Sequence, residues 1–214
     1  TAQLIRVADG FHVWSETYDR ELKGVFALQD EIAGRIGAQL QTSLGVAVAP
    51  TARTPIPPEA YDDYLKGRAL YRKRQSLMQA LAYFDSAVER APEFAAGWAS
   101  LALTYETVHG YVTPAEVASL GDVGARLRNT SERAIALEPG SAMSLHVQGN
   151  LARADFRYAE AERLYRQAME VDPTYPDVRE DLAQLYNIVG RNDDAVVEVR
   201  KLVALEPFVA NFWM

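Results

Sequence analysis

Four prolines recur along this chain, the last three at a fixed interval, and each follows a short stretch of residues typical of the C-terminal end of a helix. Pro139, Pro173 and Pro207 succeed one another at intervals of 34 residues, and Pro92 stands 47 residues before Pro139. Proline ends helices because it lacks the backbone N–H and disfavours helical geometry in the residue before it. A chain punctuated in this way is expected to consist of repeated helical units rather than one irregular globule.

The residues before each proline carry a matching stripe. Positions 12, 8 and 5 residues upstream hold a small, a large and a small or apolar side chain, and this spacing places all three on one helix face. Small residues there allow a neighbouring helix to approach closely. The triplets are Ala80, Phe84 and Ala87; Ala161, Tyr165 and Ala168; and Ala195, Val199 and Leu202.

A second stripe opens after each proline, with relative positions 0, 3, 4 and 7 on one side of a helix. Its members are Trp98, Leu101, Ala102 and Tyr105; Leu145, Gln148, Gly149 and Ala152; and Arg179, Leu182, Ala183 and Tyr186, with a looser version at Tyr64, Gly67, Arg68 and Tyr71. Each unit therefore reads as helix, turn, helix, proline.

This pattern resembles the tetratricopeptide repeat, a helix–turn–helix of 34 residues with an aromatic, Leu, Gly and Tyr stripe followed by Ala, aromatic, Ala and Pro. The resemblance implies an all-α superhelix over residues 58–214. We expect its repeats at 58–92, 93–139, 140–173 and 174–207, with the start of a fifth at 208–214.

The second unit is longer than the family period, and the excess lies in residues 106–126. Thr113, Pro114 and Glu116 form a capped helix start, with proline in the first turn and glutamate placed to cap back. The insertion is predicted to hold an extra short helix or to lengthen the second helix. An elaborated turn is the alternative.

The segment before the repeats has a different character. Two stretches rich in β-branched and aromatic residues flank Asp9-Gly10, which is typical of a β-hairpin. Residues 25–44 carry apolar side chains four apart and are predicted to form an amphipathic helix. Residues 45–57 are a Pro/Ala-rich linker.

Residues 1–44 resemble the end of a TolB-like α/β domain, through Trp14-Ser15-Glu16-Thr17-Tyr18 and Phe26-Ala27-Leu28-Gln29. Such segments precede tetratricopeptide repeats in bacterial signalling proteins. The resemblance implies a larger protein, with a class III adenylate or guanylate cyclase as the first choice. A winged-helix transcriptional activator and a Ser/Thr kinase are the alternatives. A hairpin without sheet neighbours exposes strand edges, so residues 1–44 are also expected to mediate a homodimer.

Composition and motifs argue against catalysis in this stretch. The chain has no cysteine and three histidines, which fall in separate predicted elements without metal-ligand spacing. It contains no nucleophile elbow, phosphate-binding loop or dinucleotide fingerprint. We therefore expect no catalytic residue, no metal and no cofactor.

Net charge and hydropathy limit the classes of partner that this chain is expected to bind. A net charge of −7 disfavours nucleic acid, which requires positive surface. No apolar run reaches the roughly 18 residues of a membrane span, so no membrane segment is expected. The compartment stays open, with bacterial cytoplasm slightly favoured over periplasm.

A protein or peptide partner is the remaining expectation. In the tetratricopeptide family the first helix of each pair lines a concave groove that holds extended peptides or helices. Helical geometry predicts a groove that runs from a basic to an acidic end, which would orient a charged segment. The alternative is a set of solvated helix faces that bind nothing. The predicted groove residues are Lys66, Arg72, Lys73, Leu103, His146, Asn150, Arg153, Glu180, Gln184 and Asn187.

Overall fold

The computed structural model describes residues 2–5, 12–16, 55–74 and 76–205, and the chain divides into two units, Thr1–Pro58 and Glu59–Met214. In the first unit, strands β1 (Ala2–Ile5) and β2 (His12–Glu16) pair antiparallel, with Leu4 opposite Trp14. The turn between them, the helix predicted over residues 25–44 and residues 45–54 of the linker lie outside the described residues.

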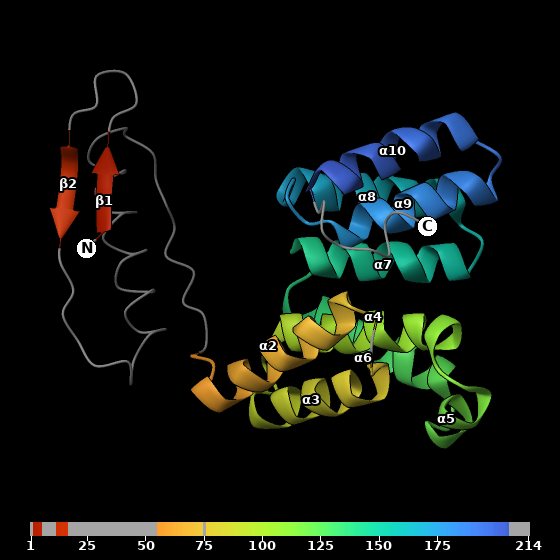
Figure 1. Cartoon of the computed structure of the whole chain (residues 1–214), viewed down its shortest axis with the longest axis horizontal. Coiled ribbons are helices and arrows are strands. Elements are labelled where there is room, and N and C mark those ends of the chain that lie inside the picture. The colour runs from red at the N-terminus through yellow and green to blue at the C-terminus, as the bar shows by residue number, and fades with distance from the viewer. Residues whose placement is uncertain (1, 6–11, 17–54, 75, 206–214) are drawn as a thin grey trace. The chain divides into compact units, whose positions relative to one another are not determined.

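The second unit is built of helix pairs (Figure 1). Each pair consists of a first helix, a connection and a second helix, and in the first three pairs a proline-containing turn follows the second helix. The pairs are α2 (Pro58–Arg72) with α3 (Leu77–Arg90), α4 (Ala95–Tyr111) with α6 (Val123–Leu137), α7 (Ala142–Ala154) with α8 (Tyr158–Val171), and α9 (Asp177–Ile188) with α10 (Asn192–Leu205).

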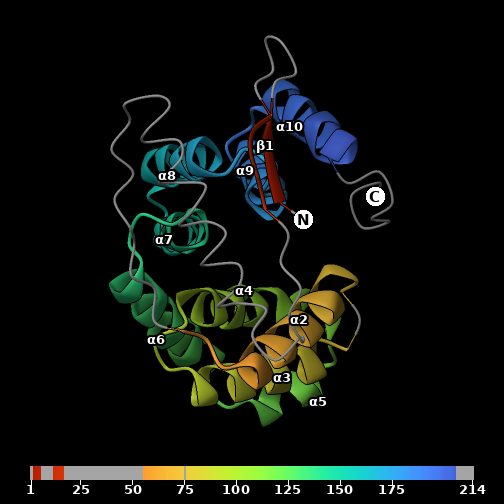
Figure 2. The same cartoon turned by 90° about the vertical axis from the view of Figure 1, so that its left-hand side faces the viewer.

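The helices stack in chain order, as two perpendicular views show (Figures 1 and 2). From α6 onward each helix packs against the next one, and the first helices also contact one another, α4 with α7 and α7 with α9. Contacts that link only neighbouring pairs are typical of a solenoid. The prediction of an all-α superhelix is confirmed for the described part of this unit.

Close approach between the two helices of a pair explains the small residues of the pattern. A Cβ atom on Gly67 would lie 2.6 Å from Cε1 of Phe84, so alanine does not fit there without movement of the ring. Gly149, one position later in the stripe of the third pair, meets the ring of Tyr165 even more closely. Ala80 and Ala161, at the other small positions, are fully buried.

One member of the predicted stripes departs from this rule. Val199 on α10 is 38% exposed, whereas Ala195 and Leu202 on the same helix are buried. Within the described residues, α10 has only α9 as a strongly contacting neighbour, so part of its apolar surface stays uncovered.

The insertion in the second pair contains a separate short helix, α5 (Pro114–Ser119). Thr113 and Glu116 form a capping box at its start: Thr113 N donates to Glu116 Oε2 at 2.9 Å, and Glu116 N donates to Thr113 Oγ1 at 3.3 Å. Gly121, with φ of 71°, then separates α5 from α6, whose first turn is capped by Asp122. Of the three forms expected for the insertion, the extra helix is the one found.

Candidate functional site

A cavity of about 360 Å³ lies where the first helices of the four pairs converge. Its walls come from the end of α2 and the turn after it, and from α4, α7 and α9. The lining residues are mainly polar and charged: Tyr71, Arg74, Glu106, Thr107, Gly110, Tyr111, Arg153, Asp177, Glu180, Asp181 and Gln184.

One side of the cavity rests on a network that joins α4, α7 and α9. Arg153 Nη2 pairs with Glu106 Oε1, and Asn150 donates its amide protons to Glu106 and, at 3.1 Å, to Asp181. Tyr165 OH donates to Asn150 Oδ1 at 2.6 Å. These bonds fix the side chains of three first helices relative to one another, so this wall is preorganised.

His146 is a buried member of this network. Its side chain is 1% exposed, with Nε2 at 2.5 Å from Asp181 Oδ2 and Nδ1 at 2.8 Å from Tyr175 OH. Burial alone would lower the pKa of His146, but the bond to Asp181 raises it above its ordinary value. The same bond, together with Arg153 and Asn150, holds the pKa of Asp181 below its usual range although burial opposes this.

Burial raises the pKa of two carboxylates that line the cavity, Glu106 and Glu180. Burial raises the pKa of Glu106 to about 7, with Asp181 adding to the rise and Arg153 opposing it. Burial also raises the pKa of Glu180. Groups with such shifts gather where charged ligands bind, although structural ion pairs produce them too.

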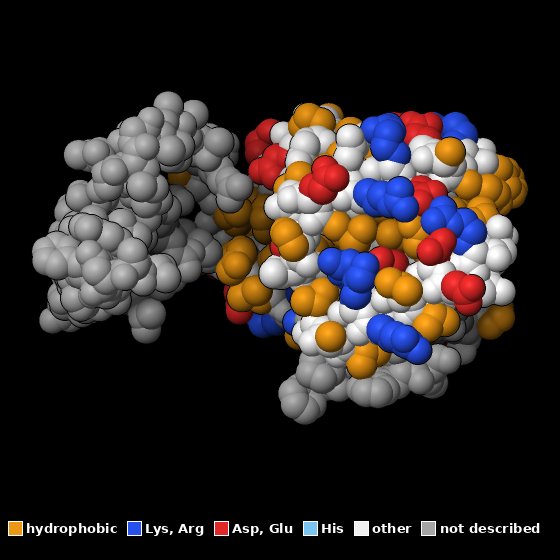
Figure 3. Space-filling model, turned by 90° about the horizontal axis from the view of Figure 1, so that it is seen from above, with side chains coloured by type: hydrophobic (Ala, Val, Ile, Leu, Met, Phe, Trp, Pro, Cys, Tyr) orange, Lys and Arg blue, Asp and Glu red, His pale blue; other side chains and the backbone are white. Residues whose placement is uncertain are grey.

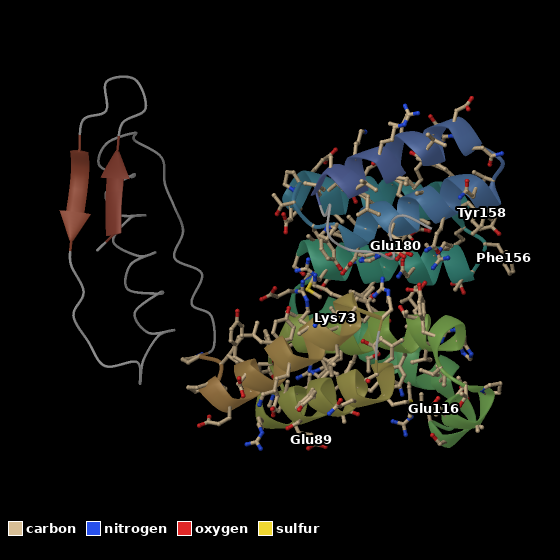
Figure 4. All side chains as sticks on the ribbon, in the orientation of Figure 1. Lys73, Glu89, Glu116, Phe156, Tyr158 and Glu180 are labelled. Carbon is tan, nitrogen blue, oxygen red and sulfur yellow. The ribbon has the colours of Figure 1, made fainter. Side chains whose placement is uncertain are left out.

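The opposite side of the cavity is formed by a contact between the first and the fourth pair. Arg74 lies over the ring of Tyr71, with Cζ 4.2 Å from the ring centroid, and Arg74 Nη2 is 2.9 Å from Glu180 Oε2. Figure 4 labels Lys73, the residue before Arg74, and Glu180 on α9. The two ends of the predicted groove therefore lie next to each other, because the array curls far enough to bring the turn after α2 to α9.

Two buried nitrogen atoms and one carboxylate that line the cavity form no hydrogen bond or ion pair within the described residues. Nε of Arg74 and Nε of Arg153 are buried and have no acceptor. Asp177, in the first turn of α9, is 8% exposed, and no hydrogen bond or ion pair to its carboxylate is found in the described part of the chain. A buried polar atom without a partner is costly, so the two arginine nitrogens call for an explanation.

The structure separates the ten predicted groove residues into three groups. Arg153, Glu180 and Gln184 line the cavity. Leu103, His146 and Asn150 are buried and do not line it, and of these His146 and Asn150 bond to lining carboxylates. The remaining four, which are exposed and do not line this cavity, are Lys66, Arg72, Lys73 and Asn187.

Lys66 shows why the basic end contributes little to the cavity. Its ammonium nitrogen lies 2.5 Å from Asp62 Oδ2, an i,i+4 pair on the surface of α2. The basic residue that does reach the cavity is Arg74, which was not predicted. It lies in the turn after α2 with φ of 50°, outside the helical face from which the groove was deduced.

Two further features of the described residues bear on function. No group of three or more His, Cys, Asp or Glu side chains that could hold a metal occurs among them, and none of their helices is long and apolar enough to cross a membrane. On the face seen in Figure 3, Lys and Arg lie interspersed with Asp and Glu. That face carries no broad positive patch of the kind that nucleic acid requires.

Part of the chain is similar in sequence to a known family and to a named relative. Residues 152–214 match the family model of the tetratricopeptide repeat. A protein of Rhizobium meliloti (strain 1021) named "Putative adenylate cyclase 3" is 35% identical over 106 residues, which are 48% of this chain and 18% of that relative's length.

Solved structures of similar fold include a thermophilic TPR protein of Thermus thermophilus. It is 18% identical with a TM-score of 0.53, over 88% of this chain and 89% of that one. The first TPR of Spaghetti (RPAP3), bound to the HSP90 peptide SRMEEVD, is 14% identical with a TM-score of 0.44, over 62% of this chain and 94% of that one. Residues 152–214 thus match the tetratricopeptide repeat family, and the stacked helix pairs of the described residues have the fold of a solved tetratricopeptide repeat protein.

Proposed function

We propose that residues 58–207 form a non-catalytic protein-interaction region that holds a segment of a partner protein against the first helices of the array. The observation that carries the proposal is the cavity at which α2, α4, α7 and α9 converge, with charged side chains of both signs facing it. Solenoids of stacked helix pairs use their concave face for binding, and a preorganised polar wall lowers the entropic cost of binding.

The broader setting of this region is a bacterial signalling protein, with a class III adenylate cyclase as its effector. Two observations support this: the resemblance of residues 1–44 to the end of a TolB-like domain, and the local similarity to the relative named as an adenylate cyclase. In this setting residues 45–57 act as a linker, and the repeats dock or regulate. Formation of cyclic AMP from ATP belongs to a part of the full-length protein outside these 214 residues.

Homodimerisation through residues 1–44 is a separate part of the proposal. The two described strands pair only with each other, so each has an edge able to pair with a second chain. Light scattering of the 214-residue chain is expected to give the mass of a dimer, and deletion of residues 1–44 is expected to give a monomer. A strict monomer at high concentration contradicts dimerisation.

Site-specific photo-crosslinking tests the binding surface. A benzophenone amino acid is placed at Gln184, which is exposed and lines the cavity, or at Glu89, which is exposed on α3 away from it (Figure 4). The partner is expected to crosslink from position 184 and not from position 89. Equal yields from the two positions, or a product from position 89 alone, would move binding to another surface.

The cyclase assignment needs its own assay. Purified full-length protein is expected to convert ATP to cyclic AMP, whereas the 214-residue chain alone is expected to be inactive. A full-length protein that forms neither cyclic AMP nor cyclic GMP contradicts the assignment and leaves the interaction role to be judged by crosslinking.

A further inference from the structure

The charge around the central cavity does not balance. Four carboxylates face it, from Glu106, Asp177, Glu180 and Asp181, against the two guanidinium groups of Arg74 and Arg153. A cavity of about 360 Å³ is at the small end of ligand sites, large enough for one long side chain but not for a folded domain.

Three of the four carboxylates are accounted for within the chain. Arg153 pairs with Glu106, and its Nη2 also lies 4.0 Å from Asp181 Oδ1, while Arg74 pairs with Glu180. Asp181 additionally holds His146 and Asn150. The cations of the cavity are thereby committed to these three acids.

Asp177 is the carboxylate left over. It is 8% exposed, has no hydrogen-bond or ion-pair partner in the described part of the chain, and lines both the central cavity and an adjoining one of about 270 Å³. Arg68 and Arg74 attract the Asp177 carboxylate electrostatically, but neither forms an ion pair with it. Arg68 Nη1 donates to Tyr64 OH at 2.9 Å, and Arg74 pairs with Glu180. The start of α9 also favours a negative charge at this position.

From this imbalance, and resting on the proposed interaction role, we infer that the cavity binds the basic side chain of an arginine from the partner segment. Its guanidinium pairs with the Asp177 carboxylate, which lines the cavity and forms no hydrogen bond or ion pair within the described residues. Pairing between guanidinium and carboxylate is planar and charge-assisted, so it gives orientation as well as affinity. The partner is thereby a segment that presents arginine, in contrast to one that presents an acidic tail.

Matched peptides test the inference directly on the full 214-residue chain. The probes are acetylated and amidated Ala-Leu-Arg-Leu-Ala and the same peptide with citrulline or glutamate in place of arginine, because citrulline keeps the shape of arginine and removes its charge. Binding is followed by NMR shifts of the Thr107, Asp177 and Gln184 amides. The arginine peptide is expected to bind about tenfold tighter than the citrulline peptide. The glutamate peptide is expected to bind most weakly.

Variants of the protein separate this pocket from general charge attraction. Asp177→Asn is expected to reduce the advantage of arginine over citrulline at least about fivefold, whereas Glu89→Gln removes the same charge on α3 and is expected to preserve it. Gln184→Lys places an ammonium group at the cavity and is expected to block the arginine peptide, and Gln184→Met is its uncharged control. Circular dichroism melts establish that each variant is folded, and the Gln184 pair decides the matter if Asp177→Asn does not fold.

Three results would overturn the inference: equal affinity for arginine and citrulline peptides, tighter binding of the glutamate peptide, or no shift with any peptide. None of these touches the interaction role itself, which is tested by crosslinking from position 184. A partner that crosslinks there but binds without a basic side chain retains the proposed function and rejects the arginine pocket.

Discussion

Arg74 and Glu180 join the first and the fourth helix pair by an ion pair, with 2.9 Å between Arg74 Nη2 and Glu180 Oε2 across a sequence separation of 106 residues. Both side chains are largely removed from solvent, at 7% and 21% exposure. In a solenoid, most contacts link adjacent repeats. A contact between the ends of the array therefore fixes its curvature and with it the width of the central cavity.

A double-mutant cycle at this pair is expected to show strong coupling. Arg74→Met and Glu180→Met each leave one buried charge without its partner, whereas the double variant removes both. We expect a coupling free energy of about 1–3 kcal/mol in urea unfolding, since the pair is mostly desolvated.

The exposed pair of Lys66 and Asp62 is the matched control for that cycle. Its side chains are 48% and 62% exposed, so the same pair of methionine substitutions is expected to show no measurable coupling. Equal coupling at the two pairs would mean that Arg74 and Glu180 are no better shielded from water than a surface pair, and that they do not fix the curvature.

Substitution of the buried glycines probes the helix contacts within a pair. In Gly149→Ala the new methyl group collides with the ring of Tyr165, which is fully buried and cannot move aside. We expect the free energy of unfolding to fall by about 1–3 kcal/mol in urea titrations.

Gly110→Ala serves as its control, because nothing lies within 4 Å of a Cβ atom on this helical glycine. There the gain in helix propensity is unopposed, and the variant is expected to be stabilised by up to about 1 kcal/mol. Similar effects from the two substitutions would show that the Gly149 contact is looser than the geometry indicates.

The contacts of Gly149 with Tyr165 and of Arg74 with Glu180 differ in whether they can be predicted from the sequence. The contact of Gly149 with Tyr165 lies within one helix pair, so the spacing of small and large residues on two adjacent helices is enough to predict it. The contact of Arg74 with Glu180 depends on the summed rotation of three successive pairs. No spacing along the chain encodes that sum, because each turn contributes a small and separate angle.

The buried groove residues make the same point in another form. His146 and Leu103 lie on the helix face that periodicity assigned to the groove, yet they are 1% and 2% exposed. Periodicity gives the angle of a side chain about its own helix and does not give what covers that angle. Here α7 lies against both α4 and α9, and Tyr175 from the turn before α9 covers His146.

Stability is expected to fall as the pH rises from about 4.5 to 8. The pKa of Glu106 is about 7 in the folded protein, above its ordinary value of 4.5, so the folded state holds more protons than the unfolded state in this range. The pKa of His146 is also raised in the folded state and acts in the same direction above pH 6.5. Excess proton binding by the folded state means that the free energy of unfolding decreases with pH.

Asp181, whose pKa is lowered, contributes stability that is lost only on acidification below about 3.8.

Urea unfolding at a series of pH values measures this dependence. Between pH 5 and 8 the free energy of unfolding is expected to drop by roughly 1–3 kcal/mol in the unmodified chain. Glu106→Gln removes the titrating carboxyl and keeps the size and planar shape of the side-chain end. The free energy of unfolding of this variant is therefore expected to change less with pH. A chain that becomes more stable between pH 5 and 7 would contradict the raised pKa of Glu106 in the folded state.

Phe156 occupies a turn that suits glycine better. It has φ of 60° between α7 and α8, and Gly190 has φ of 78° between α9 and α10. The two turns share the same hydrogen bonds: Arg157 N donates to Ala152 O, and Arg191 N donates to Tyr186 O, each at 2.8 Å. A bulky side chain in this left-handed region costs about 1–2 kcal/mol.

That strain is not repaid by burial, because Phe156 is 77% exposed, projects from the array (Figure 4) and contacts Tyr158 with ring centroids 6.2 Å apart. Phe156→Gly is therefore expected to raise the free energy of unfolding by about 0.5–1 kcal/mol, once the greater entropy of unfolded glycine is subtracted. The reciprocal Gly190→Phe is expected to lower it by at least about 1 kcal/mol. Thermal melts of both variants decide the matter, and a destabilised Phe156→Gly would show that the contact with Tyr158 outweighs the backbone strain.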